Sequence, residues 1–268
     1  SLTKFSKGIK LDDSNDYTVV NSNLNNSPLI NNFDTFDVTI SSANQETGST
    51  GDPFAAVAIV KQTTDSNHTI WCSTLGSTAL IHLYTDSNRK LIFQIGDSPA
   101  YLKFQSTHSM PLNEFYSVYI DYNSGPLDGG FVSYNHIRIK TINLINGSVS
   151  NIEGNWTNVD NGPATISTDN LFIGSADGNP NHNWSGYIVS CVFTTLRNNS
   201  KLPNETEISL MTLDPIKWMN LYKINSTFRK VLGGTENFEL NDLECAYATQ
   251  IYLMGDGTTD QYPNIFNQ

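Results

Sequence analysis

The sequence is poor in charged residues, and the basic ones are the scarcest. Asp, Glu, Lys and Arg make up 15% of its 268 residues, and 15 basic against 26 acidic side chains give a formal net charge of −11. No run of Lys or Arg occurs along the chain. Because binding to nucleic-acid phosphates depends on clustered Lys and Arg, the composition argues against a nucleic-acid partner. The acidity is compatible with a solvated surface, with cation binding or with a neutral polar ligand.

Cysteine is also scarce and is not arranged in a motif. The three cysteines, Cys72, Cys191 and Cys245, are scattered and show no CxxC spacing. This odd set predicts neither a disulfide framework nor a zinc site. Cys72 and Cys191 stand in apolar runs, where a free thiol behaves as a small hydrophobic side chain. We interpret the chain as one that matures in a reducing cytosol.

Long hydrophobic runs are missing, and 38% of the residues are hydrophobic. No run reaches the length needed to span a membrane, and the chain opens without a signal-peptide pattern. We therefore expect no membrane insertion and synthesis in a cytosol. Asn, Ser and Thr supply most of the polarity, and these residues favour turns and strand surfaces.

The chain does contain a series of short strand patterns separated by turn signals. Residues 115–122 alternate between apolar and polar, and residues 54–60 are continuously apolar, as in a strand buried on both faces. Other strands are expected at 33–40, 69–73, 79–85, 90–95, 137–145, 171–173 and 187–193, with hairpin turns at 86–89 and at Asn146–Gly147. Short helices are expected at 206–213 and 215–222.

Three segments near the end of this series form a signature when taken in order. They are Leu171-Phe-Ile-Gly-Ser, Trp184-Ser-Gly-Tyr-Ile and Leu202-Pro-Asn-Glu-Thr-Glu-Ile. The order resembles the closing signature of laminin-G-like, concanavalin A-like jelly-roll domains. The resemblance implies an all-β fold, an antiparallel β-sandwich over residues 1–213 with short helices. Residues 214–268 are expected to form a small strand-bearing C-terminal extension, with strands at 238–240 and 249–254, that packs on the sandwich or on a neighbouring subunit.

The extension contains Trp218-Met-Asn-Leu-Tyr and, further on, Ile251-Tyr-Leu-Met-Gly-Asp-Gly. With these segments it resembles the segments that follow laminin-G-like domains in phage and virus structural proteins. This resemblance implies a non-enzymatic virion surface protein, either a head or tail fibre or a capsid decoration protein, made in the host cytoplasm. Its expected partners are other virion proteins, host surface glycans and further copies of itself in a homo-oligomer. The alternatives are an extracellular location as a secreted or cell-surface lectin-like adhesin, and a polysaccharide-degrading enzyme.

Catalytic motifs are lacking. Concanavalin A-like glucanases carry E-x-D-x-x-E on one strand, and the nearest stretch here is Glu239-Leu-Asn-Asp-Leu-Glu244, in which Asn241 replaces the central Asp. None of the five histidines lies in a G-x-S-x-G or H-E-x-x-H context. We therefore expect no catalytic residues.

The candidate ligand site is the loop Asp177 to Trp184, DGNPNHNW. Sugars are held by aromatic faces together with Asn, Asp and backbone groups. The candidate ligand residues are Asn179, Asn181, His182 and Trp184, with Trp156 from a second aromatic loop. The family resemblance also implies a competing role for Trp184 as a core aromatic.

The same loop is a candidate calcium site. Asp177 and Asn179 offer the hard oxygen ligands that Ca²⁺ prefers, and Gly178 allows a tight turn. The alternative is a plain Asx-rich turn. Ca²⁺ is the only cofactor that the sequence suggests.

Overall fold

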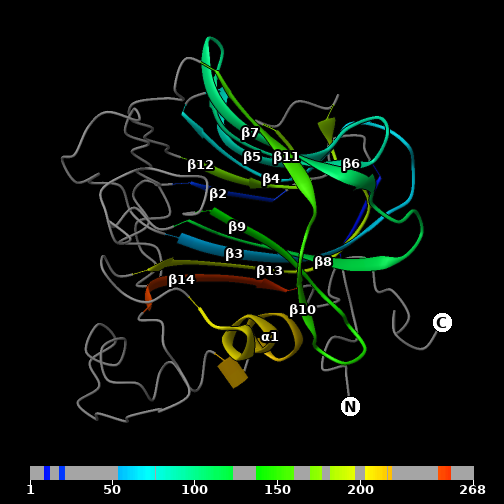
Figure 1. Cartoon of the computed structure of the whole chain (residues 1–268), viewed down its shortest axis with the longest axis vertical. Coiled ribbons are helices and arrows are strands. Elements are labelled where there is room, and N and C mark those ends of the chain that lie inside the picture. Colours follow the sequence, from blue (N-terminus) through cyan, green and yellow to red (C-terminus); the bar gives the residue numbers. More distant parts are fainter. Residues whose placement is uncertain are drawn as a thin grey trace.

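The computed structural model describes residues 9–12, 18–21, 54–75, 77–122, 137–159, 170–176, 182–196, 203–215, 217–218 and 247–254. Their strands form two sheets stacked face to face (Figure 1). Neighbouring strands within each sheet pair antiparallel, as in β3 with β8 and β5 with β6. The predicted all-β antiparallel sandwich is therefore confirmed.

The first sheet, sheet A, has the order β1-β13-β3-β8-β9-β10, and β14 also pairs with β13. The bounds are β1 Ile9–Asp12, β3 Phe54–Gln62, β8 Phe115–Tyr122, β9 Ile137–Ile142, β10 Val149–Asn151, β13 Ser185–Leu196 and β14 Tyr247–Met254. β13 divides one edge between two partners, since β1 pairs with its start and β14 with the rest. A strand from residues 214–268 is thus part of this sheet.

The second sheet, sheet B, has the order β11-β7-β6-β5-β4-β12-β2. The bounds are β2 Thr18–Asn21, β4 His68–Leu75, β5 Thr78–Thr85, β6 Lys90–Asp97, β7 Ala100–Ser109, β11 Gly154–Val159 and β12 Asn170–Ile173. The middle of the sheet, from β4 to β7, is a meander of consecutive strands. Alternate side chains of these strands therefore meet on one face in a fixed register.

The predicted strands at 54–60, 69–73, 79–85, 90–95, 115–122, 171–173 and 187–193 correspond to β3, β4, β5, β6, β8, β12 and β13. The strand predicted at 137–145 is too long. β9 ends at Ile142, because the Asn143 side chain accepts the backbone N–H groups of Ile145 and Asn146 and turns the chain early. β7, β10 and β11 were not predicted. The strands expected at 33–40 and 238–240 lie outside the described residues.

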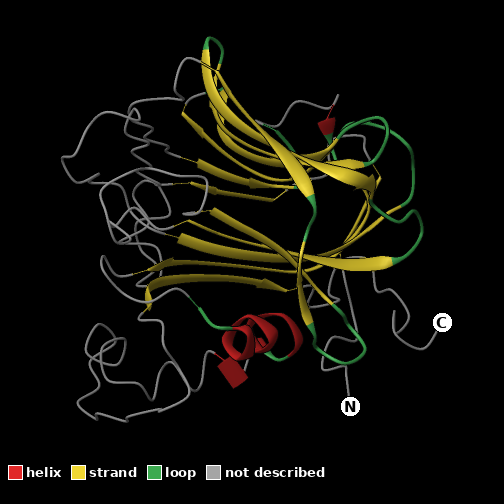
Figure 2. Cartoon of the chain, in the orientation of Figure 1, coloured by secondary structure: helices red, strands yellow, loops and turns green. Residues whose placement is uncertain are grey.

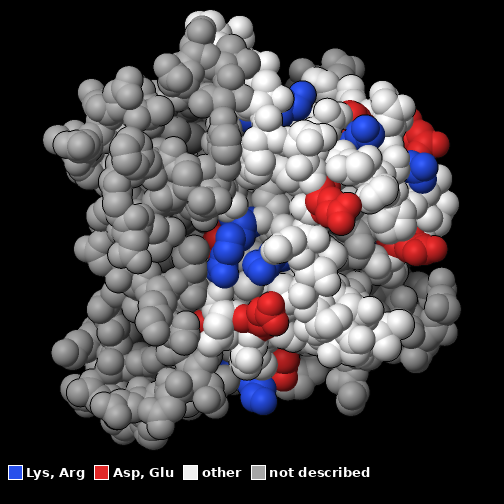
Figure 3. All heavy atoms as spheres, viewed as in Figure 1, with Lys and Arg blue, Asp and Glu red and all other residues white. Residues whose placement is uncertain are grey.

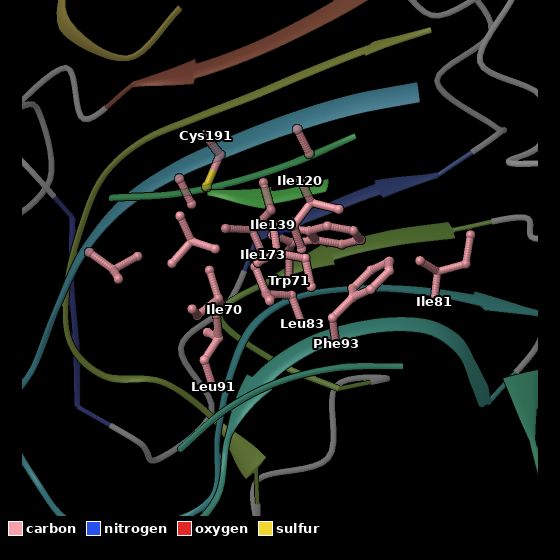
Figure 4. Packing of buried hydrophobic residues seen from close by; sticks show 14 of the residues in the cluster. Ile70, Trp71, Ile81, Leu83, Leu91, Phe93, Ile120, Ile139, Ile173 and Cys191 are labelled. Carbon is pink, nitrogen blue, oxygen red and sulfur yellow. The ribbon is translucent and has the colours of Figure 1, made fainter. Parts of the chain in front are cut away.

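The main core fills the space between the sheets (Figure 4). At its centre, the fully buried Trp71 contacts Phe54 and Phe193 edge-on, with ring centroids 6.4 and 5.4 Å apart. Cys191 points into the same core as a free thiol, and burial raises its pKa. The predicted role of this cysteine as a small hydrophobic side chain is confirmed.

A second apolar layer covers the outer face of sheet A. It joins β3, β8 and β13 to α1, which spans Glu205–Leu213 and lies against this face in Figure 2. Its buried members are Ala55, Val57, Tyr119, Ile142, Val192, Ile208, Met211 and Trp218. The chain remains helical at Pro215, Lys217 and Trp218. The two segments that the sequence predicts as helices, 206–213 and 215–222, therefore both contain helical residues.

The start of α1 explains one of the sequence signatures. Asn204 is the N-cap, and its side chain accepts the Glu207 backbone N–H at 2.9 Å. Glu207 in turn accepts the Asn204 backbone N–H at 2.9 Å, which completes a capping box. The Asn-Glu-Thr-Glu segment thus fixes where this helix begins.

Two glycines of the other signature segments are required by close packing. Gly186 has a φ of +136°, and a Cβ there would collide with the backbone carbonyl of Lys61. Gly174 has a φ of +81°, and a Cβ there would collide with the Leu11 side chain. Only glycine adopts such backbone angles readily, so both positions serve the sandwich itself.

A buried ion pair ties the second apolar layer together. Asp121 on β8 is fully buried and accepts hydrogen bonds from Arg138 on β9 and from the Tyr119 hydroxyl. Burial raises the pKa of Asp121, and the contacts with Arg138 and Tyr119 oppose that rise. Arg138 also donates to the Pro203 carbonyl at 2.8 Å, just before α1. The pair therefore links two strands to the segment that leads into the helix.

Candidate functional site

The outer face of sheet B differs from that of sheet A in carrying polar side chains. Along β5, Ile81 and Leu83 are fully buried in the core, whereas His82 and Tyr84 alternate with them and are half-buried. The register places His82 beside Gln94 of β6, and Gln94 beside Lys103 of β7. A polar row therefore crosses three neighbouring strands on this face.

This face contains a pocket of about 400 Å³, which we call the sheet B pocket. Its lining residues from strands β4 to β7 are His68, Thr69, His82, Tyr84, Ile92, Lys103 and Gln105. Asn67, Asp86 and His182 line it from loops. The pocket thus joins the middle of sheet B to the segment that precedes β13.

The rings of His82 and Tyr84 are stacked within the pocket lining. Their centroids lie 4.3 Å apart with an interplanar angle of 26°. Residues two apart on a strand project from the same face, so β5 brings the two rings together. The Nε2 atom of His82 is held by the Thr69 hydroxyl at 2.8 Å. The pair therefore forms an ordered aromatic wall.

Both rings of this wall are uncharged near neutral pH. Burial, with a smaller contribution from His182, lowers the pKa of His82 to about 3. Burial, with the nearby negative charge of Asp86, raises the pKa of Tyr84 to about 12. A neutral imidazole and a neutral phenol can each donate and accept hydrogen bonds. The wall therefore suits a ligand with neutral polar groups.

The carboxylate of Asp86 is engaged within the protein. Its Oδ1 atom accepts the backbone N–H groups of Asn88 and Lys90 at 2.8 and 2.9 Å. Its Oδ2 atom accepts from the Gln105 side-chain amide at 3.0 Å. Asp86 therefore fixes the β5–β6 turn and the Gln105 amide.

The surface charges on the face shown in Figure 3 are mixed. Acidic and basic side chains of described residues are interspersed there, without a large patch of one sign. On this face, the described residues therefore form no continuous positive stripe of the kind that nucleic-acid phosphates require.

The structure places two of the predicted ligand residues, His182 and Trp184, in different environments. His182 is exposed and lines the sheet B pocket. Trp184, two residues later, is fully buried in the core, so its ring has no face free for a ligand. Its assignment as a ligand residue is therefore wrong, and the core role is correct.

Trp156 also lies on the core side of its strand. It packs on Phe104, its cross-strand neighbour on β7, with ring centroids 5.2 Å apart. The two residues that flank it in sequence, Asn155 and Thr157, are exposed. Since alternate residues face opposite sides, Trp156 does not belong to the polar outer face, and a ligand role for it stays a prediction.

The other predicted site residues, Asp177, Asn179 and Asn181, lie outside the described residues. Within the described ranges, no three His, Cys, Asp or Glu side chains come together as metal ligands would. The calcium site at Asp177 and Asn179 stays a prediction.

Sequence reasoning missed the strand residues of the pocket. His82, Tyr84, Lys103 and Gln105 all line it, yet none was singled out as a ligand residue. The available signal was the alternation of polar residues in 80–84 and 101–105, which places each set on one strand face.

No protein-family model matches the chain, and no curated protein matches it. Solved structures with similar folds are sandwich domains of low sequence identity. The CBM40 domain of a Ruminococcus gnavus sialidase, bound to α2,3-sialyllactose, has a TM-score of 0.44 and 11% identity over 77% of this chain and 96% of that one.

Two further structures come from animals. A heptameric SAP-like pentraxin from Limulus polyphemus has a TM-score of 0.38 and 12% identity over 84% of this chain and 97% of that one. Domains LG4-5 of the mouse laminin α1 chain have a TM-score of 0.41 and 9% identity over 75% of this chain and 45% of that one. The sandwich fold of this chain is established by its own strand pairing.

Among the residues that the structure describes, no helix is both long and apolar enough to cross a membrane.

Proposed function

We propose that this protein is a non-enzymatic carbohydrate-binding module and that the sheet B pocket holds the sugar. One observation carries the proposal. A stacked pair of neutral rings, His82 and Tyr84, converges with amide and hydroxyl groups in a pocket of about 400 Å³. Pockets of this size with a few convergent polar groups are typical of small-ligand sites.

The chemistry of the lining suits a sugar. Sugar hydroxyls both donate and accept hydrogen bonds, and the imidazole, phenol and amide groups of the pocket can do the same. The apolar C–H face of a sugar ring can pack on an aromatic face. His82 and Tyr84 keep their neutral forms because the pKa values are shifted to about 3 and about 12.

The lining also supports a non-enzymatic role. Hydrolysis of a glycosidic bond ordinarily uses two carboxyl groups that face the bond. The described lining contains one carboxylate, Asp86, and both of its oxygens accept hydrogen bonds from the protein. The E-x-D-x-x-E-like stretch from Glu239 to Glu244 lies outside the described residues.

The second part of the proposal concerns the location of the protein. We propose that it acts on a virion surface, in a head or tail fibre or a capsid decoration protein, as a homo-oligomer that attaches to host glycans. The support is the sequence resemblance of residues 214–268 to phage and virus structural proteins. Mass spectrometry of purified virions tests this role, and absence of the chain from the particles would favour a lectin-like adhesin of a cell.

A glycan array tests the binding function. The purified protein is applied with CaCl₂ and with EDTA, and each hit is then measured by isothermal titration calorimetry. We expect His82→Ala and Tyr84→Ala to weaken binding at least about tenfold, because each removes a wall of the pocket and its hydrogen bonds. His108→Ala is the matched control, since His108 is exposed on the same sheet and does not line the pocket.

Three results would change the proposal. If no glycan binds, or if both pocket variants bind as well as the wild type, the sheet B pocket is not a sugar site. Loss of binding in EDTA would support a calcium site such as Asp177 with Asn179. Hydrolysis of a glucan panel, abolished by Glu239→Gln, would revive the polysaccharide-degrading enzyme.

A further inference from the structure

We infer that His68 is a positioning residue that holds His182 at the edge of the sheet B pocket. The inference concerns the architecture of the pocket, and only its effect on ligand affinity rests on the proposed function. Both residues line the pocket, but His68 is 2% exposed at the start of β4, whereas His182 is exposed.

The contact that carries the inference joins His68 to the residue after His182. The Nδ1 atom of His68 lies 2.6 Å from the Asn183 carbonyl oxygen. A carbonyl can only accept, so Nδ1 carries the hydrogen and donates it. Asn183 is 1% exposed, and the hydrogen bond is therefore shielded from water. Such a bond fixes the backbone next to His182 more firmly than an exposed one would.

The other ring nitrogen fixes the orientation of the imidazole. The Nε2 atom of His68 lies within hydrogen-bond distance of the Thr64 hydroxyl, at 2.8 Å. The ring also meets Trp184 edge-on, with centroids 6.0 Å apart. With both nitrogens and one side of the ring engaged, His68 is held in a single tautomer and orientation.

The hydrogen bonds continue from His68 to the strand that carries the aromatic wall. The Gln62 amide donates to the Thr64 carbonyl at 2.7 Å, and Thr85 donates to the Gln62 side-chain oxygen at 3.1 Å. Gln62 and Thr85 are both fully buried. Because Thr85 directly follows Tyr84, this chain of contacts connects the His82–Tyr84 wall on β5 with the His182 segment.

Backbone hydrogen bonds also hold the residues that follow Asn183. The Trp184 N–H donates to the Gly174 carbonyl at 2.8 Å, and the Thr63 N–H donates to the Ser185 carbonyl at 2.9 Å. These bonds hold the start of β13, whereas the His68 contact lies one residue from His182. Loss of the His68 contact should therefore release His182 while β13 stays in place.

The test compares two substitutions of His68. His68→Phe keeps a ring against Trp184 but removes both nitrogens. His68→Asn keeps a side-chain N–H near the position of Nδ1 and should retain the bond to Asn183. Thr107→Val is the control for general effects of substitution on sheet B, because Thr107 is exposed on β7 and does not line the pocket.

The first measurement needs no ligand. In NMR spectra of the full chain, His68→Phe should shift the imidazole signals of His182. It should also raise amide exchange at Asn183 at least about tenfold, because the segment opens more often once the bond to the Asn183 carbonyl is lost. His68→Asn and Thr107→Val should leave both within about twofold of the wild type. Unchanged His182 signals and exchange in His68→Phe would overturn the inference.

The second measurement uses a glycan that binds the wild type. His68→Phe should weaken binding about five- to tenfold, and His68→Asn should restore it. In a His182→Ala background, His68→Phe should have almost no further effect, because the two residues act through one contact. Equal losses in both backgrounds would overturn the inference. If no glycan binds the wild type, the proposed function fails while the NMR result still decides the role of His68.

Discussion

The two outer faces of the sandwich differ in what their outward side chains contact. On sheet A, apolar outward residues such as Val57 of β3 and Val192 of β13 pack beneath α1 with Met211 and Trp218. On sheet B, the outward residues of β5 and β7 are polar, and they line a pocket. The same strand alternation thus builds a second core on one side and a candidate binding surface on the other.

The ionic groups of the two faces differ in the same way. On sheet A, Asp121 is fully buried and is neutralised by Arg138, so its charge serves the packing of strands and helix. On sheet B, His82 and Tyr84 stay neutral beside the pocket. Substitutions on sheet A should therefore act on stability, whereas substitutions on sheet B should act on binding.

Loss of the buried ion pair should have the largest effect. We expect Arg138→Met to lower the free energy of unfolding by about 3–5 kcal/mol, because it leaves the Asp121 charge buried without its partner. Ligand affinity should not change. Urea unfolding measures the loss, and Lys140→Met on the same strand is the control, with an expected change within about 0.5 kcal/mol.

A double substitution tests whether the unpaired charge causes the loss of stability. Asp121→Asn together with Arg138→Met removes both charges and should recover most of the lost stability. A loss below about 1 kcal/mol for Arg138→Met alone would show that the pair contributes little, and the contrast between the two faces would then be weaker.

Truncation of the layer under α1 should have the next largest effect. Met211 is fully buried there, and Met211→Ala should lower the free energy of unfolding by about 2–5 kcal/mol through lost contacts and a cavity. Thr206→Ala, at an exposed position of α1, should change it by less than about 0.5 kcal/mol. The prediction would be contradicted if Met211→Ala and Thr206→Ala were equally stable in thermal and urea unfolding.

Much of the sandwich could be predicted because its strands carry local signals. The apolar run at 54–60 and the alternation at 115–122 each encode a strand without reference to the rest of the chain. β7 shows the same alternation, and its Leu102 and Phe104 side chains point into the core. The polar residues between them made this strand hard to recognise in the sequence. β11 has a single large apolar residue, Trp156, and so gave too little periodic signal.

The candidate site was less predictable because it depends on register between strands. His82, Gln94 and Lys103 lie on three strands, and only the pairing of β5, β6 and β7 brings them into one row. His182 was found because the loop before Trp184 is rich in polar residues. Trp156 was expected in a loop because the strand β11 was not predicted, so the face to which its side chain points could not be derived from the sequence.

Acid should destabilise the protein partly through His82. The folded-state pKa of about 3 lies below the ordinary value of 6.5, so His82 contributes stability that is present above pH 6.5 and is lost as pH falls toward 3. We expect the unfolding free energy of the wild type to fall more steeply than that of His82→Gln between pH 6 and 4, by at most about 1.4 kcal/mol per pH unit.

Urea unfolding at a series of pH values measures this difference. His108→Gln is the control, because His108 is exposed on the same sheet and should leave the pH dependence as in the wild type. Parallel pH profiles for the wild type and His82→Gln would mean that His82 is not held neutral by the fold, and the neutral character of the aromatic wall would be in doubt.

Removal of a single hydroxyl from the pocket should have the smallest effect on stability and the clearest effect on binding. Tyr84→Phe keeps the stacked ring and removes one hydrogen-bonding group from the lining. We expect unfolding free energy to change by less than about 0.5 kcal/mol and glycan affinity to fall about three- to tenfold. Tyr101→Phe on β7, outside the pocket lining, should change neither quantity. If Tyr84→Phe lowered stability as much as Met211→Ala and left affinity unchanged, the outer face of sheet B would be a packing surface like that of sheet A.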